Sequence, residues 1–406
     1  MTFIRNRFTF FLFACILLLC HFPLSAQEAI LSSYERNFIR ASLSAKSRVL
    51  IDAALDERSG EFLASLYNTA LSFVLANGAF LRDDPDMIAL VATVAKGTAA
   101  IGNSSPAAAA DSVNKLWGLF QMFNDPYTRV EILGGLANMG RNNRELTGNL
   151  NKFLSDETAA FRRANFNNQA ANREFPVTLA CISALRVLGD GSSFPVLFSA
   201  MTSGYPQVII QESLKAMEAI QGNFKDYLVD IIKNNPFSEK AAAFRIGAYN
   251  ERFSAPERGE LAQAALEVSL ESSGPAELAL RYDAITVLTR LKWSPAASSA
   301  IRNFHKVYSD YSGGVAPRDR LVEAINCLGV MSSSEAAQVL ALQLGFINSQ
   351  TEKTGNYDDA IILAIINSLG ELADKAAFDN LLYIGYLNYP DKTKSAAREA
   401  LARLKW

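Results

Sequence analysis

Few residues in this chain could perform acid–base or nucleophilic chemistry. It contains two histidines, His21 and His305, whereas a serine or cysteine nucleophile usually needs a base of near-neutral pKa, which histidine supplies. A zinc site needs several cysteine or histidine ligands, which so few histidines and four cysteines do not assemble. The chain also lacks the Gly-x-x-x-x-Gly-Lys and Gly-x-Gly-x-x-Gly phosphate loops. The sequence therefore predicts no cofactor and no metal.

Paired carboxylates are the remaining catalytic option. The Asp-Asp doublets are Asp83-Asp84 and Asp358-Asp359, and an acid and a base across a cleft could hydrolyse a glycan in an all-helical enzyme. Both doublets instead resemble helix starts, where the positive end of the helix dipole favours acids. Sugar clefts tend to be rich in tryptophan, and this chain has three. A glycan-active enzyme is therefore the least favoured interpretation, and we expect no catalytic residues.

The first residues have the pattern of a signal peptide. Arg5 and Arg7 precede an almost unbroken apolar run, 8–20, and Leu24-Ser25-Ala26 offers a small residue at the cleavage position. We expect cleavage after Ala26, which makes 1–26 the signal peptide and places the mature protein in the periplasm or otherwise outside the cytoplasm of a bacterium.

Two other outcomes stay open for this segment. An uncleaved anchor would need about 20 apolar residues to span a membrane, and the run is shorter than that. Cys15 or Cys20 could be lipidated in a bacterial lipobox, which would anchor the protein to a membrane. If cleavage removes them, Cys181 and Cys327 remain, and we expect both to be buried as small hydrophobes without a disulfide.

The overall charge argues against a nucleic-acid partner. The chain has 39 Lys and Arg against 41 Asp and Glu, a formal net charge of −2, and the expected cleavage would remove two further arginines. Nonspecific nucleic-acid binding depends on neutralising phosphates with cations. We therefore expect a protein or peptide partner, with membrane contact limited to the transient signal peptide or a lipid anchor.

The elements that position these residues follow from one apolar stripe that recurs along the chain. Each copy has the spacing i, i+3, i+4, i+7, which is one face of a helix. The copies end at Met139, Leu188, Ile220, Leu291, Leu328, Leu369 and Leu404. Repeat lengths near 40 residues are typical of arrays of helix pairs.

The stripe and its punctuation predict about nine helix pairs. Glycine follows or nearly follows the stripe at Gly189, Gly329 and Gly370, where a helix end favours a residue that tolerates positive φ. Cap-Pro dipeptides, as at Asp125-Pro126 and Ser294-Pro295, predict helix starts. The expected pairs are 60–80 with 85–101, 106–123 with 126–140, 143–154 with 175–189, 193–203 with 206–221, 223–235 with 238–253, 256–272 with 275–291, 295–309 with 317–329, 334–348 with 357–370, and 374–388 with 391–405.

These units resemble the HEAT-repeat (armadillo-like) family. Ser183-Ala184-Leu185-Arg186-Val187-Leu188-Gly189 is similar to the closing motif of the family's second helix. Counting back eleven positions places the family's basic slot at Arg129, Arg281, Arg318 and Lys394, while Thr178 and Asp359 occupy it in two other copies. The resemblance implies an all-α, right-handed α-solenoid over 85–406, with capping helices over 27–84. It also implies that the basic slot serves mainly to stabilise the array.

Inserts within the repeats give a second candidate surface. We expect loops at 155–174, 310–316 and 349–356, between the two helices of their pairs and therefore along one rim. The loop at 155–174 contains many polar residues and the pair Phe161 and Phe166, which could bind a peptide or a glycan. The alternative is a solvated, mobile loop without a binding role, which would have the same composition. Loops longer than about a dozen residues are often functional.

The sequence therefore predicts an exported, noncatalytic scaffold or adaptor that holds a protein or peptide partner. The second helices would line the concave face, as they do in the HEAT family. An alternative is a cell-envelope structural or assembly factor that binds glycan or outer-membrane components through the insert rim. The candidate partner-binding residues are Phe161, Arg162, Arg163, Phe166, Gln211, Lys215, Arg290, Glu323, Asn326 and Asn367.

Overall fold

A computed structural model describes residues 33–56, 60–101, 106–166 and 175–405. Within these ranges every extended regular element is a helix, and the β pairing consists of one isolated bridge between Asp374 and Lys405. The predicted all-α class is confirmed. The expected signal peptide, 1–26, lies outside the described residues. The chain divides into two compact units, the first up to Gly222 (unit 1) and the second from Asn223 (unit 2).

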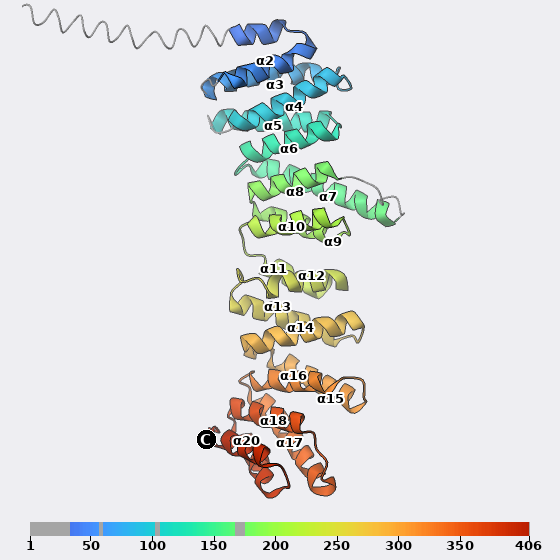
Figure 1. Ribbon diagram of the computed structural model, residues 1–406, viewed down its shortest axis with the longest axis vertical. Coiled ribbons are helices and arrows are strands. Elements are labelled where there is room, and N and C mark those ends of the chain that lie inside the picture. Colours follow the sequence, from blue (N-terminus) through green and yellow to red (C-terminus); the bar gives the residue numbers. More distant parts are fainter. Residues whose placement is uncertain (1–32, 57–59, 102–105, 167–174, 406) are drawn as a thin grey trace, which may run out of the picture. The chain divides into compact units, whose positions relative to one another are not determined.

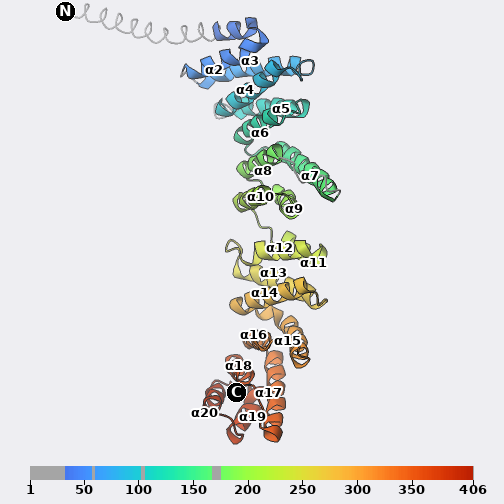
Figure 2. The same ribbon diagram turned by 45° about the vertical axis from the view of Figure 1, so that its right-hand side comes forward.

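Unit 1 consists of consecutive helices that pack as neighbours (Figures 1 and 2). After a helical segment at 33–40, its elements are α2 (Leu43–Leu55), α3 (Gly60–Gly78), α4 (Pro85–Ile101), α5 (Pro106–Met122), α6 (Pro126–Met139), α7 (Arg144–Phe166), α8 (Pro176–Leu188), η1 (Gly191–Ser193), α9 (Phe194–Thr202) and α10 (Gln207–Ala219). Each of α3, α5, α7 and α9 packs on the helix that follows it, and α4, α6, α8 and α10 also pack on one another in turn.

Unit 2 repeats this arrangement. Its elements are α11 (Lys225–Asn234), α12 (Phe237–Ala248), α13 (Ala255–Leu270), α14 (Pro275–Leu291), η2 (Ser294–Ala296), α15 (Ala297–Ser312), α16 (Arg318–Gly329), α17 (Ser334–Thr354), α18 (Asp359–Leu372), η3 (Lys375–Ala377), α19 (Phe378–Tyr383), η4 (Ile384–Tyr386) and α20 (Asp391–Ala402). The second helices α14, α16, α18 and α20 again contact one another in sequence.

The recurring stripe forms the core of both units. Every one of its positions is buried except Met139, Leu188, Leu291 and Leu401, which are half-buried. Removing apolar side chains from water at about 25 cal/mol per Å² is the main favourable term in folding. The stripe therefore works as the sequence predicted, because it faces the neighbouring helices rather than solvent.

The stripe glycines differ in their roles. Gly189 ends α8 in the left-handed conformation, with φ 67°, as predicted. The prediction was wrong for Gly329 and Gly370, which are still helical in α16 and α18. A Cβ on Gly329 would lie 2.9 Å from the Cα of Ser368, and one on Gly370 would lie 3.2 Å from the Cα of Ala400. These glycines therefore allow close contact between second helices.

The predicted inserts are largely extensions of first helices. Helix α7 continues to Phe166, α15 to Ser312 and α17 to Thr354, so the prediction of a loop at 155–166 was wrong, as it was for most of 349–356. Tertiary contacts explain the added turns of α17, because the hydroxyl of Tyr389 lies 2.9 Å from Oγ1 of Thr351. Residues 167–174 lie outside the described part of the chain.

The acids at predicted helix starts are N-caps. Asp84 Oδ1 accepts a hydrogen bond from the Asp86 amide at 2.8 Å, and Asp125 and Asp358 accept similar bonds at the starts of α6 and α18. A side-chain oxygen there satisfies amides that have no partner within the helix. Ser294 differs from the prediction, because it opens η2 and does not cap α15.

Candidate binding surface

Two residues of the predicted basic slot stabilise the ends of first helices. Nε of Arg129 donates to Phe123 O at 2.7 Å, just after α5, and its guanidinium lies 4.8 Å from the ring centroid of Phe120. Arg281 is fully buried, and its Nη2 donates to Ser269 O and Ser272 O at 2.7 and 2.8 Å, at the end of α13. Cations are favoured at the negative end of a helix dipole. Burial lowers the pKa of both guanidinium groups.

The other two slot residues do not cap a first helix in this way. The guanidinium of Arg318 is about half exposed and lies 3.9 Å from a carboxylate oxygen of Asp358. Lys394 lines a groove between α19 and α20. The slot therefore contains two kinds of cation, one that completes the fold and one that is open to solvent.

The candidate residues on α7 divide in the same manner. Phe161 is buried and stacks on Tyr205, with ring centroids 3.9 Å apart. Nε of Arg162 donates to Ser203 Oγ at 2.7 Å, next to the end of α9. Phe161 therefore packs α7 against its neighbours, and Arg162 links α7 to the end of α9 although the residue is exposed. Arg163 is exposed, and the side chain of Phe166 lies outside the described part of the chain.

On the second helices of unit 1, the candidates lie beside a network of charges. Gln211 and Lys215 are exposed on α10. Glu212 lies between two cations, with its oxygens 3.3 Å from Nε of Arg186 on α8 and 3.8 Å from Nζ of Lys215. One carboxylate therefore neutralises much of the positive charge that this part of the surface presents.

The second helices of unit 2 carry arginines stacked on tyrosines. The guanidinium of Arg290 on α14 lies 5.6 Å from the ring centroid of Tyr249, the residue that ends α12. Arg320 on α16 lies 4.0 Å from the ring of Tyr282 on α14. Its Nη1 also donates to a carboxylate oxygen of Glu323 at 2.7 Å. A guanidinium held over a ring keeps donors at its edge for a ligand.

The two asparagine candidates extend this surface. Asn326 on α16 and Asn367 on α18 are exposed, one turn or less from buried stripe positions. We call Tyr249, Tyr282, Arg290, Arg320, Glu323, Asn326 and Asn367 the second-helix face of unit 2. The sequence predicted exposure for Arg290, Glu323, Asn326 and Asn367. Arg290, Asn326 and Asn367 are exposed, whereas Glu323 is half-buried as a residue, with its side chain 45% exposed.

Sequence reasoning missed Tyr249, Tyr282 and Arg320. The sequence signal that could have identified these residues is an aromatic residue near the solvent-facing edge of one second helix, followed by an arginine at the start or end of the next second helix. That pairing becomes visible only when the register between adjacent helices is known. Burial raises the pKa of the Tyr249 hydroxyl, and Asp283 adds to the effect, so the phenol stays neutral and can donate a hydrogen bond at physiological pH.

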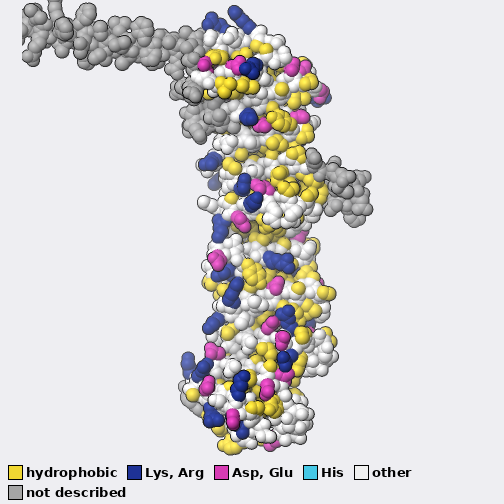
Figure 3. All heavy atoms as spheres, in the orientation of Figure 1, with side chains coloured by type: hydrophobic (Ala, Val, Ile, Leu, Met, Phe, Trp, Pro, Cys, Tyr) yellow, Lys and Arg dark blue, Asp and Glu magenta, His cyan; other side chains and the backbone are white. Residues whose placement is uncertain are grey.

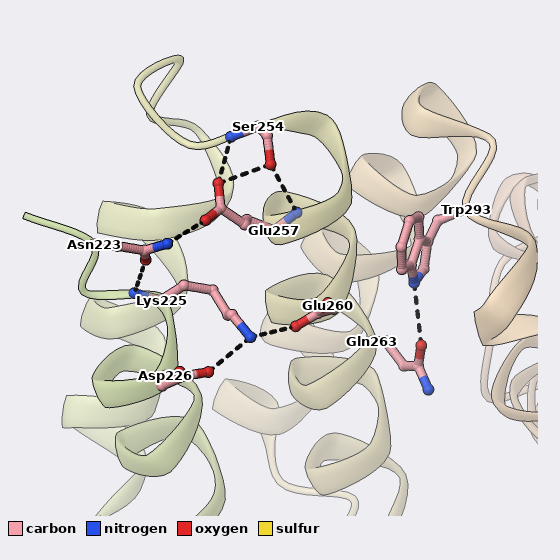
Figure 4. Close-up of polar contacts among 8 residues, drawn as sticks. All are labelled: Asn223, Lys225, Asp226, Ser254, Glu257, Glu260, Gln263 and Trp293. Atoms are coloured by element: carbon pink, nitrogen blue, oxygen red, sulfur yellow. Dashed lines mark hydrogen bonds and ion pairs between the residues drawn. The ribbon is translucent and has the colours of Figure 1, made fainter.

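A polar cluster at the start of unit 2 has a structural role (Figure 4). Nζ of Lys225 lies 2.7 Å from Asp226 and 2.6 Å from Glu260, and hydrogen bonds to these carboxylates raise its pKa. The capping box of Ser254 and Glu257 begins α13. All these groups are satisfied by one another, which ties α11 to α13 and leaves them poorly placed for a ligand.

The scarce catalytic residue types differ in their burial. His305 is exposed on α15, and the free thiols of Cys181 and Cys327 are buried in different units. Burial raises the pKa of both thiols, that of Cys327 to about 11. Within the described ranges, no group of three or more His, Cys, Asp or Glu residues could hold a metal ion.

Exposed charges of both signs are mixed with hydrophobic atoms on the face drawn in Figure 3. Among the helices that the structure describes, none is long and apolar enough to cross a membrane.

Comparisons with protein-family models and with curated proteins found no match. The case for function therefore depends on the geometry of the second-helix faces.

Proposed function

We propose that this protein is an exported, noncatalytic scaffold that holds a protein or peptide partner on the second-helix face of unit 2. In this proposal the chain is a HEAT-like, right-handed α-solenoid whose second helices form the partner-binding side. The packing of α14, α16, α18 and α20 on one another supports it, because side chains from successive helices then form one continuous surface.

The arginine–tyrosine pairs of this face are the observation that carries the proposal. Arginine and tyrosine are enriched in the residues that contribute most to protein interfaces. The pairs Tyr249–Arg290 and Tyr282–Arg320 join adjacent helices, so the side chains are held in place before a partner arrives. Preorganised side chains lose less conformational entropy on binding.

Site-specific photo-crosslinking in cells tests the binding face. A photoreactive residue at Asn326 or Asn367 should give the same covalent adduct, whereas one at exposed first-helix positions, Arg302 on α15 or Gln338 on α17, should not. The adduct should weaken in an Arg290→Ala/Arg320→Ala variant that keeps its helical circular dichroism. Equal crosslinking from both sets of positions would argue against the proposed face.

Export is tested separately by fractionation and intact mass. The proposal expects a periplasmic protein whose mass corresponds to a chain that begins at Gln27. A cytoplasmic protein of full mass would contradict export while leaving the binding face untouched. A membrane-bound form with a lipid on Cys15 or Cys20 would replace the soluble periplasmic assignment with an anchored one.

A further inference from the structure

A groove near the end of unit 2 combines an apolar floor with two cations. It has a volume of about 300 Å³ and lies between α19, η4 and α20. Its lining includes Leu381, Leu382, Tyr386, Lys394, Arg398 and Leu401, and none of its lining residues is acidic. Figure 3 shows Lys and Arg side chains over the C-terminal helices of this unit, mixed with Asp and Glu side chains and hydrophobic atoms.

The two cations of the groove form no ion pair with the described residues. Within the described ranges, the hydrogen bond that Arg398 forms runs from its Nε to the carbonyl of Lys394, at 3.3 Å. Arg403, near the end of the same helix, shows the contrasting case, because its Nη1 lies 2.8 Å from Glu371. Like charges four residues apart on a helix destabilise it by about 0.2–0.5 kcal/mol, so Lys394 and Arg398 weaken α20 unless an anion lies between or beside them.

The broken first helix of this pair explains why Lys394 does not cap a first helix. Arg129 and Arg281 occupy the same slot and donate to carbonyls at the end of a regular first helix. Here α19 ends after six residues and continues as the 3₁₀ turn η4. The Lys394 side chain lines the groove instead.

Apolar side chains of the groove are also exposed. Leu382 is 42% exposed and Tyr386 78% exposed, at a place where burial would be favourable. A volume of about 300 Å³ is at the lower limit for small-molecule sites, and suits one or two apolar side chains better than a cofactor or an extended acyl chain. Exposed apolar contacts beside unpaired cations are typical of surfaces that bind amphipathic peptides.

We propose that this groove, which we call the α19–α20 groove, binds an acidic amphipathic peptide segment of a partner protein. Lys394 and Arg398 are one turn apart, about 6 Å along α20, which matches two carboxylates at positions i and i+4 of a helical segment. A leucine or phenylalanine on the same face of the peptide would contact Leu382, Tyr386 and Leu401. The groove shares no residue with the second-helix face of unit 2, and the proposal does not depend on the role of that face.

Fluorescence anisotropy with purified protein tests the proposal. The probe is a labelled helical peptide with two glutamates four residues apart and leucines on the same face, and the control peptide has lysines in place of the glutamates. Wild-type protein should bind the acidic peptide saturably. Lys394→Glu/Arg398→Glu should bind it about tenfold or more weakly, since two attractions become repulsions, and should now bind the lysine peptide.

A matched variant separates a site from general electrostatics. Lys392→Glu/Lys405→Glu changes the net charge equally near the same helix, at exposed residues that do not line the groove, and should bind the acidic peptide like wild type. Tyr386→Ala should weaken binding without reversing the peptide preference. Circular dichroism should be unchanged in all variants, because the substituted side chains lie at the surface.

Four results would overturn the proposal. The first is that the acidic peptide does not bind saturably, and the second is that both charge variants lose binding equally. The third is that the protein co-sediments with anionic lipid vesicles and the peptide does not displace it from them. The fourth is a concentration-dependent dimer that Arg398→Glu dissociates. The third would assign the groove to a membrane surface and the fourth to a second copy of the chain. Arg290→Ala/Arg320→Ala should bind the peptide normally, which keeps this test independent of the proposed function.

Discussion

The cations of unit 1 and unit 2 have different neighbours. In unit 1, Arg162 bonds to the end of α9 and Arg186 lies beside Glu212. In unit 2, Arg290 and Arg320 lie over tyrosine rings on the second-helix face. Arginines close helix ends or balance acids in both units, as Arg281 and Arg403 do in unit 2. Unit 2 in addition holds two arginines over tyrosine rings between successive second helices.

This difference shows why exposure alone is a poor guide to a binding residue. An arginine beside a carboxylate has already lost much of its attraction for a second anion, and a surface ion pair is worth only about 0–1 kcal/mol. A guanidinium over a ring with no carboxylate beside it keeps its edge donors, and among the described residues Arg290 forms no ion pair, whereas Arg320 gives one donor to Glu323. Unit 2 is therefore the better candidate for partner binding.

Replacing Phe161 by alanine should have the largest effect on stability. Phe161 is buried against Tyr205 and Phe175, and removing a buried phenylalanine costs about 3–5 kcal/mol. Urea unfolding and hydrogen exchange of α7 and α9 should show this loss in unit 1. Tyr249→Ala in unit 2 is the comparison, and it should cost less stability than Phe161→Ala because Tyr249 is 44% exposed.

If Phe161→Ala proves neutral for folding and instead reduces partner capture, the contrast between the units would be wrong. The predicted insert region at 155–174 would then again be a candidate binding surface, with Phe161 as one of its contacts.

Replacing the two capping arginines, Arg129 and Arg281, tests the basic slot and should have an intermediate effect on the free energy of unfolding. Arg281→Ala should cost about 2–3 kcal/mol, since the buried carbonyl of Ser269 and the more exposed carbonyl of Ser272 both lose a charged donor. Arg129→Ala should cost about 1 kcal/mol, because Arg129 is only half-buried and water can replace it at Phe123 O. Chemical denaturation of both variants measures the difference.

Arg281→Met provides the control for volume. It restores most of the apolar packing and removes two guanidinium nitrogens that have no partner, Nε and Nη1, so it should cost less than Arg281→Ala. A methionine variant as unstable as the alanine variant would show that the hydrogen bonds at the end of α13 outweigh packing.

The smallest expected effect is the loss of stability on acidification that comes from protonating one aspartate in each unit. Asp190 accepts a hydrogen bond from the Ser192 amide, and Asp374 accepts one from the Ser334 hydroxyl. These bonds hold the pKa of both carboxyl groups below the usual value. Their stabilisation is present above the unfolded pKa of about 3.9, and it is lost as the pH falls through the lower folded pKa.

Thermal melts from about pH 6 to pH 2.5 measure this contribution. Asp190→Asn and Asp374→Asn should melt below wild type at the upper pH and approach it at the lower pH. Asp374→Asn should show the larger difference, because Ser334 links α17 to η3. A constant difference at every pH would exclude ionisation as the cause.

Most of the helix arrangement could be predicted from the sequence because it depends on local pattern. The stripe, the proline-marked starts and the acidic caps act over four to seven residues, and they placed elements such as α6 and α14 within a residue or two. The extension of α7 could not be predicted in this way. It depends on Phe161 meeting Tyr205, which is far away in the sequence.

The candidate surface was predictable only in part for the same reason. Helical phase indicated that Asn326 and Asn367 would be exposed. It could not show that Arg320 would lie over Tyr282, since that contact depends on the register between α14 and α16. The glycines were misassigned because a glycine that ends a helix and one that allows a close helix contact look alike in sequence.

The burial of Cys181 and Cys327 links folding to oxidative chemistry. A thiol reacts with oxidants mainly as its thiolate, and in the folded chain these sulfurs are both shielded and protonated. Oxidative crosslinking is therefore a hazard for the newly made chain alone, during the interval before α8 and α16 pack. A delay in folding, not age or exposure to peroxide, would decide how much of the protein becomes trapped with non-native disulfides.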